Sequence, residues 1–218
     1  MKLKYWLLII AIILIGAYLL FNSDTVEYAE LNDSPHVKGN LEASVSLVEF
    51  SDFECPACGY ASNQLGAWLE AYTDKIKFEY RNYPLSSIHK YAFQAAEAAE
   101  CAADQGYFWE YYDKLFANQQ NLSKKDLALY ASQIDKLDLE LWQDCLDSDA
   151  KAKRVQDDLD EARRMGLSFT PTFILNGQVI DDWQKLPELI QALVEPLVPL
   201  QQEATTTQSY LRNARFST

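Results

Sequence analysis

The chain has only two histidines, His36 and His89, and 19 basic residues against 32 acidic ones. Two histidines are too few for a histidine-rich metal centre. The net charge of −13 repels polyphosphates, so we expect no nucleic-acid partner and assign the acidic excess to a well-solvated surface. Apolar residues make up 49% of the 218 residues and aromatic residues 13%, which excludes a wholly disordered chain and predicts a packed core.

The N-terminal stretch indicates where the chain works. Lys2 and Lys4 precede an uninterrupted apolar run over residues 5–21, and the residues just after it are polar or acidic. A helix of this length spans roughly 25 Å, at the short end of what a bilayer core requires. Because basic residues stay in the cytoplasm, we predict a single-pass anchor over residues 1–22 in the cytoplasmic membrane, with the rest facing the periplasm or the cell exterior. A cleaved signal peptide is the alternative, although no A-x-A-like site follows the run.

If the domain is exported, the four cysteines can form two disulfides, because disulfides form and persist outside the cytoplasm. Cys55 and Cys58 stand where a β-rich run over residues 45–50 gives way to a helical pattern. At this i, i+3 spacing both thiols lie on one face of the first helical turn, close enough to bridge. The helix dipole and the unpaired N–H groups favour a thiolate on Cys55, which stabilises the reduced pair and makes its disulfide a stronger oxidant.

Two other interpretations of the pair remain open. It could form a structural disulfide, although an i, i+3 bridge is strained in a helix. It could also supply half of a zinc site, which would require two more ligands. Cys101 and Cys145 are the remaining cysteines, but they are not paired in sequence.

The remaining patterns predict an α/β domain interrupted by helices. Residues 76–80 alternate as a strand, residues 88–164 have helical spacing, and Asn176-Gly177 separates two β-rich runs as in a hairpin. We therefore divide the chain into an anchor (1–22), a tether (23–43), a first sheet part (44–86), a helical insertion (87–166), a second sheet part (167–196) and a disordered tail (197–218).

Several motifs together resemble one known family. The run Glu49-Phe50-x-x-Phe53-x-Cys55-Pro56-x-Cys58, with Thr170-Pro171 ahead of the hairpin, resembles the thioredoxin-fold proteins of the DsbA family, in particular its membrane-anchored BdbD-type group. The resemblance covers about residues 40–195. It implies an α/β thioredoxin fold with an inserted helical domain, preceded by one N-terminal transmembrane helix.

The resemblance also implies roles for single residues. Cys55 would be the nucleophile and Cys58 its partner, while Pro171 would carry a cis peptide bond facing the active disulfide. Thr170 would present its backbone to a substrate strand, beside Pro56 and Ala57 of the dipeptide. The strongly oxidising relatives have Pro-His as this dipeptide, so Ala57 puts the oxidising strength of this chain in question.

Three further positions have roles implied by the family, each with an alternative. Glu49 stands where the family has a buried acid, which could accept or relay the proton of Cys58, while a solvated carboxylate on an edge strand is the alternative. Cys101 and Cys145 occupy the place of a structural disulfide found in some relatives, and two free buried thiols are the alternative.

The function expected from the resemblance is an extracytoplasmic protein disulfide oxidoreductase that introduces disulfides into reduced exported proteins. It would need neither metal nor cofactor, and a quinone-linked membrane oxidase of the DsbB or vitamin K epoxide reductase type would reoxidise it. A disulfide reductase or isomerase using the same centre is the nearest alternative. A tethered, non-catalytic peptide-binding holdase is the alternative from another class.

Three other features do not enter this hypothesis. We assign His89 to a cap or the surface, and the aromatic residues between 107 and 112 to core packing. The acidic residues Asp157, Asp158, Asp160 and Glu161 match no calcium loop, and we assign them to a solvated helix face.

Overall fold

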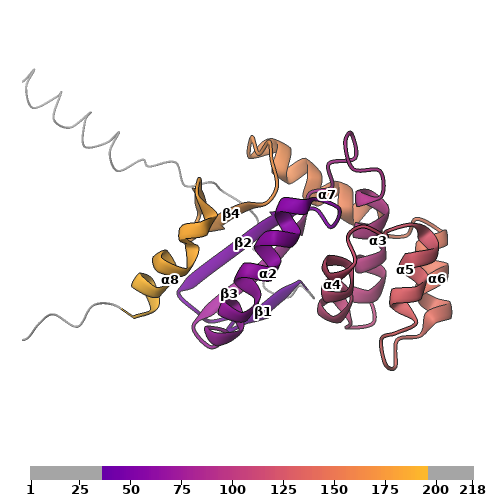
Figure 1. Cartoon of the computed structure of the whole chain (residues 1–218), viewed down its shortest axis with the longest axis horizontal. Coiled ribbons are helices and arrows are strands. Elements are labelled where there is room, and N and C mark those ends of the chain that lie inside the picture. The colour runs from indigo at the N-terminus through magenta and orange to yellow at the C-terminus, as the bar shows by residue number, and fades with distance from the viewer. Residues whose placement is uncertain (1–35, 196–218) are drawn as a thin grey trace, which may run out of the picture.

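The structure is a computed structural model that describes residues 36–195 (Figure 1). Its five-stranded sheet has the order β1-β3-β2-β4-β5. The strands β2 (Val45–Ser51) and β3 (Ile76–Asn82) are parallel, and all other neighbours are antiparallel. The remaining strands are β1 (Val37–Gly39), β4 (Thr172–Leu175) and β5 (Gln178–Ile180).

Helices cover both faces of the sheet and also form a separate layer beside it. They are α2 (Pro56–Ala71), α3 (Ala92–Ala103), α4 (Phe108–Ala117), α5 (Lys124–Ala131), α6 (Leu139–Asp147), α7 (Ala152–Arg164) and α8 (Leu186–Val194), with the short 3-10 helix η1 (Trp183–Lys185). Leu47 of β2 packs with residues of α2 and α8, whereas the next residue, Val48, packs with α7. Side chains alternate between the two faces of a strand, so β2 is apolar on both sides.

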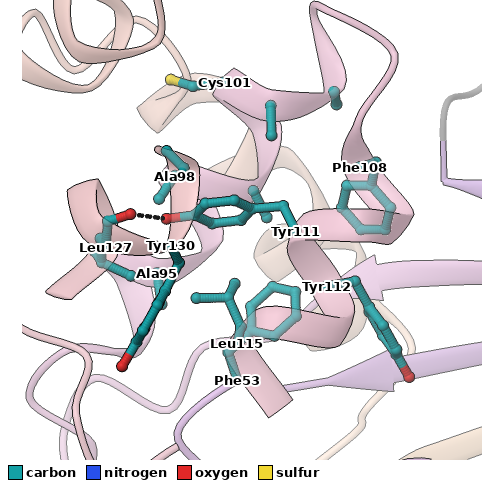
Figure 2. Close-up of a cluster of buried hydrophobic side chains, with 14 of the residues drawn as sticks. Phe53, Ala95, Ala98, Cys101, Phe108, Tyr111, Tyr112, Leu115, Leu127 and Tyr130 are labelled. Carbon is teal, nitrogen blue, oxygen red and sulfur yellow. Dashed lines mark hydrogen bonds between the residues drawn. The ribbon is translucent and has the colours of Figure 1, made fainter. Parts of the chain in front are cut away.

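The predicted helical insertion spans α3 to α7, and these helices pack in two different places. Helices α3 to α6 lie together to one side of the sheet, and α7 returns to cover a sheet face (Figure 1). Phe53, from the loop after β2, inserts into the aromatic cluster of this helical layer, with its ring centroid 5.1 Å from that of Tyr80 and 5.0 Å from that of Phe116. Figure 2 shows Phe53 within this cluster, where the Tyr111 hydroxyl donates to the Leu127 carbonyl at 2.9 Å.

Local signals placed several elements correctly. The hairpin is confirmed, because β4 and β5 pair around Asn176 and Gly177, both of which have positive φ. Ser123 caps α5 in a capping box with Asp126, and its backbone N–H donates to the Asp126 carboxylate at 3.2 Å. Phe108, Tyr111 and Tyr112 are buried in the core, as expected of the aromatic run.

The structure corrects the sequence analysis near the start of the domain. Residues 37–39, assigned to the tether, form the edge strand β1, which pairs with β3. Three residues are too few to show a period of two, so the pattern missed them. The anchor predicted over residues 1–22 and the tail over residues 197–218 lie outside the described residues. Between residues 36 and 195, no helix has the length and apolar character needed to cross a membrane.

A second correction concerns the acidic face assigned to solvent. Asp158 is 1% exposed, and it lies with Glu161 against the buried Arg81 of β3. The Arg81 Nη1 atom is 2.6 Å from a Glu161 oxygen, and its Nε atom contacts Glu79. Buried charges need partners of opposite charge, and here those partners come from β3 and α7. Ion pairs as well as apolar packing therefore hold α7 on the sheet.

Candidate active site

Cys55 and Cys58 lie at the N-terminus of α2, where the chain leaves β2. Cys55 is the N-cap residue, and Pro56 occupies the first helical turn, where a missing N–H has no intrahelical acceptor. Both cysteines are free thiols, so the structure describes the dithiol form of the pair. Cys58 is fully buried and Cys55 is 7% exposed, while Pro56 and Ala57 between them are exposed.

The Cys55 thiol is activated by its surroundings. Hydrogen bonding from the Cys58 side chain is the largest influence on its pKa and lowers it, while burial opposes this. The Thr170 side chain and the backbone N–H groups of Cys58 and Ala57 lower it further, and the resulting pKa is about 5. Groups at a helix N-terminus stabilise a thiolate in this way, so Cys55 is ionised at neutral pH.

Cys58 has the opposite character. Burial raises its pKa well above the usual range, and the neighbouring Cys55 and Glu49 raise it further. Its sulfur accepts a hydrogen bond from the Asp52 backbone N–H at 3.4 Å. The two thiols therefore differ strongly, with one a reactive thiolate near the surface and the other a buried, protonated thiol.

Glu49 lies in β2, between β3 and β4, and is 2% exposed. The alternative of a solvated edge-strand carboxylate is therefore wrong. Burial raises the pKa of Glu49 to about 7, against a smaller lowering by a hydrogen bond from Ser51. A carboxyl group with this pKa can gain or lose a proton near neutral pH. The charge of Glu49 also raises the pKa of Cys58.

The loop before β4 faces the same thiols. The Thr170–Pro171 peptide bond is cis, and when Cys55 is protonated its sulfur donates to the Thr170 carbonyl at 3.6 Å. Thr172 fixes the loop by donating from its hydroxyl to the Phe169 carbonyl at 2.7 Å. The structure thus brings the site residues from three separate segments together.

Gln119, in the turn after α4, holds the active-site loop from the other side and was missed by the sequence analysis. Its Nε2 atom donates to the Phe53 carbonyl at 2.9 Å and to the Cys55 carbonyl at 2.8 Å. Gly59 leaves the room for it, because a Cβ atom there would lie 1.9 Å from Gln119 Oε1. Nothing in the local sequence marks Gln119, since its partners are more than sixty residues away.

Asp52 and His89 form a second contact that the sequence analysis missed. Asp52 lies in the loop before Cys55, and its carboxylate is fully buried. His89 Nδ1 lies 2.8 Å from Asp52 Oδ2, so the assignment of His89 to a cap or the surface is wrong.

The two remaining cysteines lie in the helical layer, away from the redox pair in sequence. Cys101 of α3 and Cys145 of α6 are joined by a disulfide. They are therefore bonded to each other and do not serve as the two extra ligands that the zinc interpretation required. The described residues, 36–195, contain no group of three or more His, Cys, Asp or Glu side chains placed to hold a metal ion.

Fold and site together define a class of enzyme. A mixed sheet with helices on both faces and an unequal thiol pair at a helix N-terminus is the arrangement of a thiol–disulfide oxidoreductase, which exchanges a dithiol for a disulfide. The sequence profile of a family described as Thioredoxin matches residues 31–195. The chain belongs to this thioredoxin family, and its structural neighbours are of the DsbA and BdbD type.

Two solved structures illustrate the similarity. BdbD from Bacillus subtilis, in its oxidised form, has a TM-score of 0.67 and 27% sequence identity, over 79% of this chain and 99% of that one. DsbA2 from Pseudomonas aeruginosa has a TM-score of 0.61 and 23% identity, over 78% of this chain and all of that one, which shows the shared fold.

Curated relatives with higher identity carry another name. A Na(+)/H(+) antiporter NhaA 3 of Salinispora tropica is 44% identical over 146 residues, which is 67% of this chain and 22% of the antiporter. The Na(+)/H(+) antiporter NhaA 1 of Mycolicibacterium vanbaalenii is 37% identical over 149 residues, which is 66% of this chain and 24% of that antiporter. This chain thus spans less than a quarter of each of these relatives, so the match concerns one segment of them.

Proposed function

We propose that this protein is an extracytoplasmic oxidase of thiols, which introduces disulfides into reduced exported proteins through the Cys55–Cys58 pair. The observation that carries the proposal is the inequality of the two thiols, with the Cys55 pKa at about 5 and the Cys58 pKa raised. A stabilised Cys55 thiolate favours the dithiol form of the pair, so the disulfide form readily takes electrons from a substrate.

The reaction begins with the Cys55–Cys58 disulfide and a substrate dithiol. A substrate thiolate attacks the Cys55 sulfur, the Cys55–Cys58 bond breaks, and Cys58 leaves with the electron pair and takes up a proton. A second substrate thiolate then attacks the substrate sulfur of the mixed disulfide, and Cys55 leaves as a thiolate. Two electrons pass to the protein, the substrate gains one disulfide, and the low pKa of Cys55 makes it a good leaving group.

We assign Glu49 the role of proton donor to Cys58 as that sulfur leaves. Its pKa of about 7 keeps a proton available near neutral pH, and its charge acts on Cys58. We assign substrate contact to Pro56 and Ala57, which are exposed, and to Thr170, whose carbonyl contacts the Cys55 sulfur. We assign Pro171, which is buried and follows the cis peptide bond, the role of shaping the loop next to the attacked sulfur.

The proposal includes the location and the partners of the protein. An anchor over residues 1–22 and a tether would hold the catalytic domain on the outer side of the cytoplasmic membrane, and the Cys101–Cys145 bridge is consistent with an oxidising compartment. Similarity to BdbD supports this placement. A quinone-linked membrane oxidase would return the dithiol to the disulfide.

The test is the reduction potential of the pair in the full-length protein, equilibrated in glutathione buffers. We expect a potential above about −180 mV, the value of protein disulfide isomerase, as for a donor of disulfides. A potential below about −230 mV would overturn the proposal in favour of a reductase. A disulfide with such a low potential does not readily accept electrons from substrate thiols.

A second experiment separates catalysis from simple peptide binding. In an assay that follows disulfide formation in a reduced, unfolded test protein, Cys55→Ser is expected to remove all activity, because no sulfur remains to accept the substrate thiolate. Cys58→Ser is the matched control: it cannot form the protein disulfide either, but its Cys55 thiolate is expected to attack oxidised glutathione, forming a mixed disulfide and releasing one glutathione thiolate. Full activity in Cys55→Ser would favour the holdase alternative.

A further inference from the structure

The Asp52 carboxylate lies at the centre of a compact set of contacts beside the redox pair. Its Oδ2 atom accepts a hydrogen bond from the Leu85 backbone N–H at 2.8 Å and lies 2.8 Å from His89 Nδ1. Its Oδ1 atom accepts from the Glu54 backbone N–H at 2.7 Å. The turn from Leu85 to His89 closes on itself through the His89 N–H and the Leu85 carbonyl, at 2.9 Å, so it wraps around one buried carboxylate.

The backbone of the same residue contacts both cysteines, one at its sulfur and the other at its backbone N–H. The Asp52 N–H donates to the Cys58 sulfur at 3.4 Å, and the Asp52 carbonyl accepts from the Cys55 N–H at 3.1 Å. His89 is therefore bonded to the residue that positions both cysteines. Its side chain is 16% exposed and that of Asp52 is not exposed, so water screens this contact only in part.

Charges around His89 favour its cationic form. Burial lowers its pKa, but the hydrogen bond and charge of Asp52, followed by the charges of Cys55 and Glu54, raise it above its usual value. Lys90 is the adjacent cation on the same segment, but its ammonium group lies over the Tyr91 ring, 4.7 Å from the centroid. The coupling between His89 and Cys55 acts in both directions, because each group stabilises the charged form of the other.

We propose that His89 is a positioning residue of the redox centre, whose imidazolium, held on the buried carboxylate of Asp52, stabilises the Cys55 thiolate. The dipeptide between the cysteines, Pro56 and Ala57, carries no charge, and a residue from beyond β3 supplies one instead. Without that cation, Asp52 would leave an uncompensated negative charge beside the thiols. This role belongs to dithiol–disulfide exchange itself and holds for either direction of electron flow.

The first test compares three variants of the full-length protein. His89→Gln keeps an amide that can donate to Asp52 but removes the charge, His89→Lys restores a charge, and Lys90→Gln removes a neighbouring charge that does not contact Asp52. The readouts are the ultraviolet absorbance of the thiolate against pH and the equilibrium constant with glutathione.

We expect His89→Gln to raise the pKa of Cys55 by about one unit, as removal of one partly screened charge would. The equilibrium constant with glutathione then shifts about tenfold toward the disulfide form, or about 30 mV. His89→Lys should recover much of this shift, and Lys90→Gln should stay near the wild type. A Cys55 titration and equilibrium constant in His89→Gln equal to those of the wild type would overturn the proposal.

The second test needs no substitution, so it holds even if a variant fails to fold. The chain has only two histidines, and their ring resonances can be followed separately against pH by nuclear magnetic resonance. Oxidation to the Cys55–Cys58 disulfide removes the thiolate, so the pKa of His89 should be lower in the oxidised protein by about one unit, the amount by which His89→Gln raises the pKa of Cys55. His36, bonded to Glu100 at 3.0 Å, is the internal control. An unchanged His89 pKa would refute the coupling, whatever the absolute potential of the wild type.

Discussion

Replacing Cys58 by alanine tests why Cys55 is acidic. The hydrogen bond from the Cys58 thiol is the largest influence lowering the pKa of Cys55 to about 5. Hydrogen bonds to charged groups contribute about 1.5–3 kcal/mol, and one pKa unit corresponds to about 1.4 kcal/mol. Loss of this donor should therefore raise the pKa of Cys55 by about one to two units, to about 6 or 7. The helix N-terminus still acts in the variant, so the value should stay below that of an ordinary thiol.

The assay is the pH dependence of thiolate absorbance in the reduced protein, and the matched control is Cys58→Ser. Serine keeps a hydroxyl donor at the same position, so its effect on the Cys55 titration should be clearly smaller than that of alanine. If both variants titrate at the wild-type pH, the partner thiol does not set the acidity of Cys55. The helix terminus and the Thr170 loop would then have to carry the whole effect.

Three further predictions address the groups around this pair. Burial raises the folded pKa of Glu49 from 4.5 to about 7. The wild type should therefore lose up to about 3 kcal/mol of stability relative to Glu49→Gln as the pH rises between these values, and none below 4.5. The measurement is denaturant unfolding of the oxidised forms, in which the redox thiols do not titrate, and parallel pH profiles of the two proteins would contradict the prediction. Gly59→Ala should cost about 1–2 kcal/mol, because its Cβ displaces Gln119 from the two carbonyls, and much less in a Gln119→Ala background; additive costs in a double-mutant cycle would contradict this. Replacing Cys101 and Cys145 by serine should lower the free energy of unfolding by about 4 kcal/mol for a loop of 44 residues, and an unchanged denaturation midpoint would refute a structural role.

Local patterns predicted the parts of this fold that local forces determine. The β-rich run before Cys55 became β2, the central strand, because its side chains are apolar on both faces. The Asn176-Gly177 turn was predictable because few residues accept the positive φ values that the hairpin needs. The position of the thiol pair at a strand-to-helix junction also follows from neighbouring residues alone.

Burial of charge could not be predicted in the same way. The sequence around Asp158 is typical of a solvated helix face, yet the residue lies beside Arg81 of β3, whose guanidinium is also buried. The energy that permits this comes from a partner more than seventy residues away, and no periodicity in α7 records it. The status of Glu49 was undecided for the same reason, because a single strand does not show whether it is central or at an edge.

The contacts of the active-site loop show what the helical layer does beyond packing. Phe53 enters its aromatic cluster, and Gln119 binds the carbonyls on either side of residue 54. On the other side of the loop, His89 holds Asp52, whose backbone contacts both cysteines. Residues between 85 and 119 therefore support the geometry of the redox pair together with the helix on which the thiols lie. We expect substitutions in this segment to change the acidity of Cys55 even when every residue of the Cys-Pro-Ala-Cys motif stays in place.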